Sequence, residues 1–185
     1  MGVRNYLIEG VSGAGKTAVA TELQRRGYHA VHGDRELAYR GDPETGLPVV
    51  PETGAPTVIW ISEHHIWDVE KVRALVADQE VAVTFFCGGS RNFSKFIDLF
   101  DAVFVLEVDR DTMNRRIDRR VALDPTDFGG TPEERDLIER LYATKQDVPK
   151  TAMSIDATAP IARVVDDILS KCAGGGPGTD WEAPH

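Results

Sequence analysis

Residues 10–17 of this 185-residue chain, G-V-S-G-A-G-K-T, match G-x-x-x-x-G-K-[ST], the pattern of a phosphate-binding loop. Such a loop works only where a strand ends and a helix begins, because backbone N–H groups and the helix N-terminus must face the phosphate together. The apolar run Arg4–Ile8 supplies the strand, and Lys16–Arg26 has helical spacing. The sequence therefore predicts a strand, a nucleotide-binding loop and a helix at this point.

Seven of the eight residues of this loop have an expected role. We expect Lys16 to act in catalysis by reaching the β- and γ-phosphates of a nucleotide, and the Thr17 hydroxyl to bind Mg²⁺. The other loop residues expected to contact phosphate are Gly10, Ser12, Gly13, Ala14 and Gly15. The predicted cofactors are ATP and Mg²⁺.

Strand-like and helix-like segments alternate along the chain, which is typical of a parallel sheet covered by helices on both faces. The predicted strands are Arg4–Ile8, Tyr28–His32, Val81–Cys87, Ala102–Val108 and Ala152–Ile155. The predicted helices are Lys16–Arg26, Ile66–Asp78, Phe93–Phe100, Thr112–Arg120, Pro132–Gln146 and Ile161–Leu169. Thr131 is a good cap for the fifth helix, with Pro at its first position and Glu134 three residues after the cap. We expect an α/β fold with a five-stranded parallel sheet.

Three segments lack this periodicity. Residues 41–56, rich in Pro and Gly, and residues 121–130 are expected to be mobile loops. Residues 173–185 are rich in glycine and are predicted to form a flexible tail. Residues 1–172 are thus predicted to form one domain, with a lid at about 121–131.

Composition narrows the classes of partner. Lys and Arg number 21 against 30 Asp and Glu, so nonspecific binding of nucleic acid is not expected. Apolar runs fall far below the roughly 20 residues of a membrane-spanning helix, and the N-terminus lacks the apolar segment of a secretory signal. Cys87 and Cys172 form no disulfide framework, and the adjacent His64 and His65 point apart, so no zinc site is predicted. We expect a cytoplasmic monomer or homodimer that does not bind membranes and acts on a small molecule.

Other proteins with this loop fit the sequence less well. Thr144–Asp147 resembles the [NT]KxD guanine-recognition motif of GTPases, but it ends an amphipathic helix instead of following an apolar strand. Large ATPases usually carry an acidic pair at the end of a core strand, whereas Val81–Cys87 is followed by two glycines. Both interpretations are therefore rejected.

The chain resembles the small P-loop kinases, the group that includes adenylate kinase-like, nucleoside kinase-like, shikimate and gluconate kinases. The resemblance covers residues 3–170 and rests on the P-loop, on Asp34 after the second strand, on Cys87–Asn92 after the third, and on Arg116–Arg119 before the predicted lid. It implies a nucleotide kinase-like fold whose lid closes over ATP and supplies arginines to the transferring phosphoryl group.

Asp34 stands where ligands bind in open α/β sheets, beyond the carboxyl end of a strand. Its carboxylate is predicted to accept a proton from a substrate hydroxyl, to hold the acceptor, or to bind Mg²⁺ through water. A plain helix N-cap is the alternative, because Asp before Arg35 and Glu36 is also a good cap. The acid Glu9, directly before the loop, has no assigned role.

The turn after the third strand is predicted to contact the acceptor. Gly88 and Gly89 let an acceptor approach the backbone, and Arg91 can grip a carboxylate or phosphate with its planar guanidinium. Alternatively, Arg91 lies on a solvated first turn of a helix. Trp60 is a candidate for stacking on a base or sugar, although packing is the commoner role of Trp.

Arginines gather before the predicted lid in an otherwise acidic chain. Arg116, Arg119 and Arg120 share a helical face, and we predict that Arg116 and Arg119 clamp the phosphates of ATP. A salt-bridged surface helix is the alternative. The resemblance also implies that Ala157, after the last strand, contacts adenine through its backbone.

Together these features predict an ATP-dependent phosphotransferase that moves the γ-phosphoryl group of Mg-ATP to a small-molecule acceptor. A nucleoside or nucleotide acceptor is favoured over a shikimate- or sugar-acid-like hydroxyl. The alternative is a regulatory or partner protein that binds nucleotide and has little turnover. It would bind ATP or GTP without any dependence on an acceptor.

Overall fold

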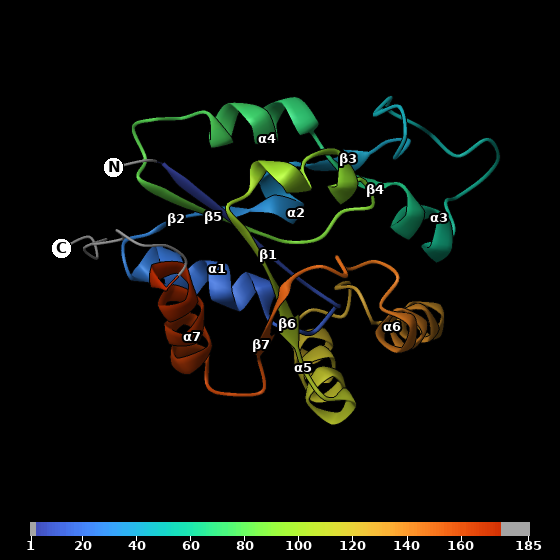
Figure 1. Ribbon diagram of the computed structural model, residues 1–185. Coiled ribbons are helices and arrows are strands. Elements are labelled where there is room, and N and C mark those ends of the chain that lie inside the picture. Colours follow the sequence, from blue (N-terminus) through green and yellow to red (C-terminus); the bar gives the residue numbers. More distant parts are fainter. Residues whose placement is uncertain (1–2, 175–185) are drawn as a thin grey trace.

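The computed structural model describes residues 3–174 and contains a five-stranded parallel sheet in the order β2-β5-β1-β6-β7 (Figure 1). The strands are β1 (Arg4–Gly10), β2 (His29–His32), β5 (Val83–Cys87), β6 (Ala102–Glu107) and β7 (Met153–Asp156). Each corresponds to one predicted strand, with small shifts at the ends. The predicted α/β fold with a five-stranded parallel sheet is confirmed.

Helices cover both faces of this sheet, as predicted. The longer ones are α1 (Lys16–Arg25), α4 (Val69–Val76), α5 (Arg110–Leu123), α6 (Pro132–Thr144) and α7 (Ile161–Ala173). Helices α1 and α7 pack against each other on one face, whereas α4 lies on the other (Figure 1). Helix α5 packs against the phosphate-binding loop, because a Cβ atom built on Gly13 would lie 3.1 Å from side-chain atoms of Met113 and Ile117.

The core consists of two apolar clusters, one on each face of the sheet. Strand β1 divides its side chains between them: Tyr6 and Ile8 join the cluster under α1 and α7, while Leu7 joins the cluster under α4. Because successive strand residues point to opposite faces, a strand covered on both sides is apolar over most of its length. Full burial of each large side chain contributes about 1.5–3 kcal/mol. This packing fixes the carboxyl end of β1, from which the phosphate-binding loop starts.

Two predicted helices differ in the structure. The helix predicted at Ile66–Asp78 begins only at Val69, because the Asp68 side chain accepts the Lys71 N–H and caps it there. Ile66 and Trp67 belong instead to a short strand. The helix predicted at Phe93–Phe100 is replaced by two 3-10 turns, η1 (Phe93–Lys95) and η2 (Ile97–Leu99). The predicted start of α6 is confirmed, since Thr131 and Glu134 form a reciprocal capping box.

Four short elements were not predicted, because each has too few residues to establish a period. They are α2 (Gly33–Glu36), β3 (Ala38–Arg40), α3 (Val58–Glu63) and β4 (His65–Trp67). Strands β3 and β4 form a separate antiparallel pair, in which Arg40 lies opposite His65. This pair lies beside α2 and brings its side chains to the edge of the main sheet where β2 and β5 end.

The aperiodic segments connect these elements. Segment 41–56 lies between β3 and α3, and its Gly41 and Pro48 form an isolated bridge. Helix α5 continues to Leu123, so the predicted lid is reduced to residues 124–131. Their predicted mobility stays a prediction, and most of the predicted tail, residues 175–185, lies outside the described residues. Within residues 3–174, no helix is long and apolar enough to cross a membrane.

Candidate nucleotide and acceptor site

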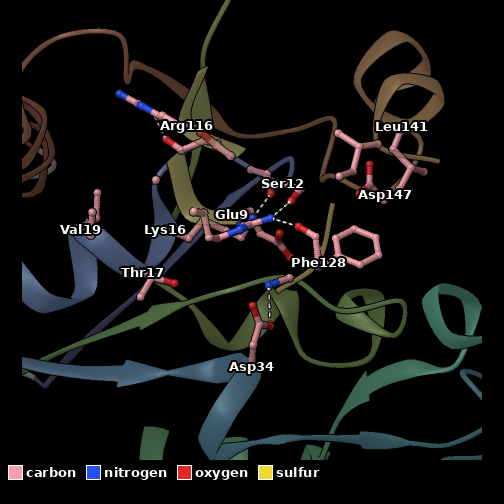
Figure 2. A pocket seen from close by; sticks show the side chains of 18 of the residues that line it. Glu9, Ser12, Lys16, Thr17, Val19, Asp34, Arg116, Phe128, Leu141 and Asp147 are labelled. Atoms are coloured by element: carbon pink, nitrogen blue, oxygen red, sulfur yellow. Dashed lines mark hydrogen bonds between the residues drawn. The ribbon is translucent and has the colours of Figure 1, made fainter. Parts of the chain in front are cut away.

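A cavity of about 850 Å³ lies beyond the carboxyl ends of β1, β2 and β5. In open α/β sheets this edge is where ligands bind. The cavity is lined by the phosphate-binding loop, α2, the turn after β5 and parts of α5 and α6. In Figure 2, Asp34 and Arg116 approach it from opposite sides, with Lys16 and Ser12 between them. The predicted phosphate-binding and acceptor-binding elements thus share one cavity.

The phosphate-binding loop curls as its glycines permit. Gly13 and Gly15 have φ of +79° and +106°, in the left-handed region that favours glycine, and Gly15 is the N-cap of α1. The Lys16 ammonium donates to the backbone carbonyls of Gly10 and Val11. It therefore bridges the loop at the place where phosphates would bind. All seven loop residues predicted to bind nucleotide or Mg²⁺ line the cavity: Gly10, Ser12, Gly13, Ala14, Gly15, Lys16 and Thr17.

Two arginines of α5 reach this loop. Arg116 donates to the Ala14 carbonyl at 3.0 Å and to the Ala157 carbonyl at 2.6 Å, joining the loop to the turn after β7. Arg120, one helical turn later, donates to the Ser12 hydroxyl at 3.4 Å and to the Phe128 carbonyl in the predicted lid. Ala157 also lines the cavity, as does Arg116.

The structure differs from the prediction at Arg119. Its side chain is exposed, and it does not line the cavity. In α5, Arg116 and Arg120 turn toward the loop, whereas Arg119 turns outward. Sequence reasoning placed all three on one face, because residues three and four apart are both neighbours on a helix, and only the packed structure distinguishes Arg120 from Arg119.

Asp34 lies in the short helix α2 and faces the cavity. Its Oδ1 atom accepts hydrogen bonds from His65 Nε2 at 3.1 Å and from the Gly89 N–H at 3.3 Å. Burial alone would raise the pKa of Asp34, but the His65 hydrogen bond and the Lys16 charge outweigh it and hold that pKa below its ordinary value. Asp34 does not cap α2, whose N-cap is His32. Its carboxylate is therefore ionised and within the electrostatic reach of Lys16.

The glycine turn after β5 shapes the wall beside Asp34. A Cβ atom on Gly88 would lie 2.6 Å from Trp67 and 2.9 Å from Asp34 Oδ1, so only glycine lets both side chains sit there. Gly89 lines the cavity, whereas Gly88 lies behind that surface. The turn therefore positions Asp34 as well as leaving room for an acceptor.

Arg91 lines the cavity, but its guanidinium is already engaged. Nε donates to the Ser62 carbonyl at 2.8 Å, Nη2 donates to the Ser62 hydroxyl, and Nη1 lies 3.5 Å from Asp147 Oδ2. These contacts tie the turn after β5 to α3 and to the segment after α6. A group on the acceptor that binds Arg91 would have to displace them.

Trp60 does not line the cavity. Its indole stacks on the His64 ring in α3, with centroids 4.3 Å apart. The next residues of the chain, Ile61 and Ser62, reach the cavity wall instead. The prediction that Trp60 contacts the acceptor therefore differs from where the structure places it.

Glu9 is a cavity residue to which sequence reasoning gave no role. It is the penultimate residue of β1, is 1% exposed, and its Oε2 atom has no hydrogen-bond partner among residues 3–174. Burial raises its pKa to about 8; Lys16 opposes this rise, while Asp34 and Asp147 add to it. An acid at the end of an apolar strand, directly before a phosphate-binding loop, is the signal that marks it.

The fold is similar to those of solved kinase structures, although the sequence is not. No protein-family model matches the chain, and no curated protein matches it in sequence. A gluconokinase from Sinorhizobium meliloti 1021 superposes with a TM-score of 0.56 at 17% identity, covering 92% of each chain. A sugar kinase from Janibacter sp. HTCC2649 gives 0.54 at 17% identity, covering 91% of this chain and 94% of that one. A shikimate kinase from Aquifex aeolicus gives 0.53 at 16% identity, covering 92% and 96%.

The chain has the fold of the small P-loop kinases. In this kinase fold the residues predicted to bind Mg²⁺, Thr17 and Asp34, face one cavity. Their hydroxyl and carboxylate oxygens are ligands that suit Mg²⁺, which usually keeps several waters and binds substrate phosphates. Within residues 3–174, no group of three or more His, Cys, Asp or Glu side chains gathers closely enough to hold a metal by itself. The donors present therefore fit a metal that is shared with a nucleotide.

Proposed function

We propose that this protein transfers the γ-phosphoryl group of Mg-ATP to a hydroxyl or phosphate of a small-molecule acceptor. One observation carries the proposal: an ionised carboxylate, that of Asp34, faces the phosphate-binding loop within one cavity. A loop that binds only nucleotide needs no such group at its acceptor end. The fold shared with gluconokinase and shikimate kinase structures is consistent with this function.

The nucleotide end of the cavity supplies binding and charge. The backbone N–H groups of residues 10–17 would hold the phosphates, with Thr17 and Asp34 completing the Mg²⁺ site. Lys16 would leave the carbonyls of Gly10 and Val11 for the β- and γ-phosphates. Arg116 and Arg120 would neutralise charge on the transferring group, and the backbone at Ala157 would contact adenine. Bound Mg²⁺ would supply further neutralisation of phosphate charge.

The acceptor end supplies the base. An acceptor hydroxyl oxygen attacks the γ-phosphorus, the bond to the β-phosphate oxygen breaks to release ADP, and Asp34 takes the hydroxyl proton. We propose a nucleoside or nucleotide acceptor ahead of a shikimate- or sugar-acid-like one. The contacts of Arg91 with Ser62 and Asp147 favour an acceptor without a charged group at that position.

The test is release of ADP from Mg-ATP in the presence of nucleosides, nucleoside monophosphates, shikimate, gluconate and amino sugars. The variant Lys16→Ala serves as the blank, because it removes the positive charge that would contact the β- and γ-phosphates. Stimulation by one acceptor class, absent from the blank, would support the proposal and identify the acceptor. Binding of ATP with no stimulation by any class would contradict it.

A second candidate is a regulatory protein that binds nucleotide with little turnover. Two apolar side chains of segment 41–56 favour it, because Leu47 is 65% exposed and Val50 is 83% exposed. Exposed apolar residues of this kind can contact a partner protein. This candidate predicts nucleotide binding that no acceptor changes, so the same assay separates the two.

A further inference from the structure

A chain of hydrogen bonds leads from β3 to Asp34. Arg40 Nη1 donates to His65 Nδ1 at 3.0 Å, and His65 Nε2 lies 3.1 Å from Asp34 Oδ1. The antiparallel pairing of β3 and β4 places Arg40 directly opposite His65. All three side chains line the cavity. Neither Arg40 nor His65 was among the residues predicted for the site.

The chemistry of the three groups fixes where the protons are. A guanidinium has only N–H donors, so His65 Nδ1 must accept from Arg40. A ring whose Nδ1 is an acceptor carries its hydrogen on Nε2, and this hydrogen points at the Asp34 carboxylate. A second proton on Nδ1 would face Arg40 and break that contact. The two contacts therefore select one tautomer of the ring, with Nδ1 facing Arg40 and Nε2–H facing Asp34.

We propose that His65 is a positioning residue that holds the Asp34 carboxylate in place for the acceptor hydroxyl, with Arg40 fixing the His65 tautomer. This inference rests on the proposed kinase function. Both hydrogen bonds to Asp34, from His65 and from the Gly89 N–H, go to Oδ1. Among residues 3–174, Oδ2 has no hydrogen-bond partner, which leaves it available to an acceptor.

The groups around His65 support this role over a purely structural one. Its backbone carbonyl accepts the Arg91 N–H at 2.9 Å, so the strand is anchored independently of the ring. The His65 side chain is 28% exposed and the Asp34 side chain is 48% exposed, so the contact lies at the cavity surface and not in the core. The ring therefore serves the site more than the packing of β4.

The proposal has a direct spectroscopic test. Long-range ¹H–¹⁵N correlation spectra of the ¹⁵N-labelled full chain report which ring nitrogen of each histidine carries a proton, and the His65→Gln variant assigns the His65 signals. We expect the neutral ring to carry its proton on Nε2, and this tautomer preference to be lost in Arg40→Met. A neutral ring with its proton on Nδ1 in the wild-type protein would overturn the proposal.

Kinetics with two amide variants test positioning itself. In His65→Gln the side-chain amide nitrogen can take the place of Nε2 and still donate to Asp34. In His65→Asn the shorter amide reaches only the place of Nδ1. We expect His65→Gln to keep most of kcat and His65→Asn to lose about tenfold or more, with KM for ATP unchanged in both. Equal kcat values for the two variants would overturn the proposal.

His64 provides the matched control. It neighbours His65, but its ring bonds to the Trp60 carbonyl and stacks on the Trp60 indole, away from Asp34. His64→Asn should leave kcat unchanged. If the wild-type protein phosphorylates no acceptor, the proposed function fails. If it does so and His65→Asn is as fast as wild type, only the role of His65 fails.

Discussion

At the scale of single residues, environment decides what each charged group can do. Asp34 and Glu9 are both carboxylic acids on the cavity wall, yet their pKa values move in opposite directions. The His65 hydrogen bond and the Lys16 charge keep Asp34 ionised. In the described part of the chain Glu9 has no such hydrogen bond at Oε2, and burial raises its pKa to about 8. One acid is thus suited to accept a proton, while the other holds one at neutral pH.

Glu9 should make stability depend on pH. Its pKa is raised from 4.5 to about 8 in the folded chain, so between these values the folded state holds a proton that the unfolded state has lost. Stability contributed by this group is therefore complete at low pH and declines as pH rises toward 8, by about 1 kcal/mol per pH unit.

Urea unfolding of wild type and Glu9→Gln at several pH values checks this. The variant keeps the shape of the side chain without its charge, and its stability relative to wild type should increase from pH 5 to about 8. Other titrating groups are common to both proteins, so they cancel in the difference. A stability difference that stays constant across this range would show that Glu9 does not bind a proton in the folded chain.

The arginines of α5 should differ sharply in their effects on turnover. Arg116→Ala and Arg120→Ala should each lower kcat by about tenfold or more, because both side chains contact the phosphate-binding loop. Arg119→Ala, the matched control on the same helix, should leave kcat within about twofold of wild type because its side chain is exposed. Steady-state kinetics with saturating Mg-ATP measure all three. A large loss in Arg119→Ala would instead support Arg116 and Arg119 as the pair that clamps the phosphates.

At the scale of elements, the sequence predicted the strands and helices that have a clear apolar period. It missed the short elements and the helix bounds that depend on single contacts. The five strands and the longer helices have enough apolar residues to establish a period. Ile66 and Trp67 fit a helical spacing equally well, and only the Asp68 cap and the pairing of β4 with β3 exclude them from α4. His65 was missed as a site residue for the same reason, because a three-residue strand has no sequence signature of its own.

The same distinction between sequence pattern and packed structure applies to the residues of the candidate site. The loop residues were predicted because a motif fixes their spacing. Arg120 and Glu9 depend on which way a side chain turns and how deeply it is buried, and these are properties of the packed structure. Sequence alone could not show that Arg91 is engaged by Ser62 and Asp147, since the three residues come from separate segments.

The capping box of α6 can be tested as an element. Thr131→Ala removes the side chain that accepts the Glu134 N–H, and it should lower the free energy of unfolding by about 1 kcal/mol. Thr144→Ala is the matched control, because Thr144 ends the same helix and its hydroxyl donates to the Arg140 carbonyl within that helix. Urea unfolding measures both. Equal losses in the two variants would contradict a specific role for the cap.

At the scale of the whole molecule, the cavity lies between the sheet and helices α5 and α6. Arg116 joins the phosphate-binding loop to the turn after β7, and Arg120 joins it to the segment between α5 and α6. A nucleotide bound there would contact elements from both ends of the chain. Ligand binding should therefore stabilise the fold as a unit.

Thermal unfolding with and without Mg-ATP measures this coupling. At a ligand concentration of about 100 times Kd, the folded state gains about 2.7 kcal/mol, which corresponds to a rise in Tm of about 5 °C or more. Lys16→Ala should show a smaller rise, because it loses a contact with the phosphates. An unchanged Tm in the wild-type protein at millimolar Mg-ATP would argue against the nucleotide site.

The most direct test of the proposed kinase is transfer of the phosphoryl group itself. Incubation with ATP labelled at the γ-phosphate and the best acceptor of the panel should place the label on the acceptor. Asp34→Asn, which keeps the shape of the side chain but cannot accept the proton, should still bind ATP and transfer label at least about a hundredfold more slowly. Labelled acceptor formed at the wild-type rate by Asp34→Asn would contradict the role of Asp34. Absence of labelled acceptor with every compound tested would contradict the kinase proposal.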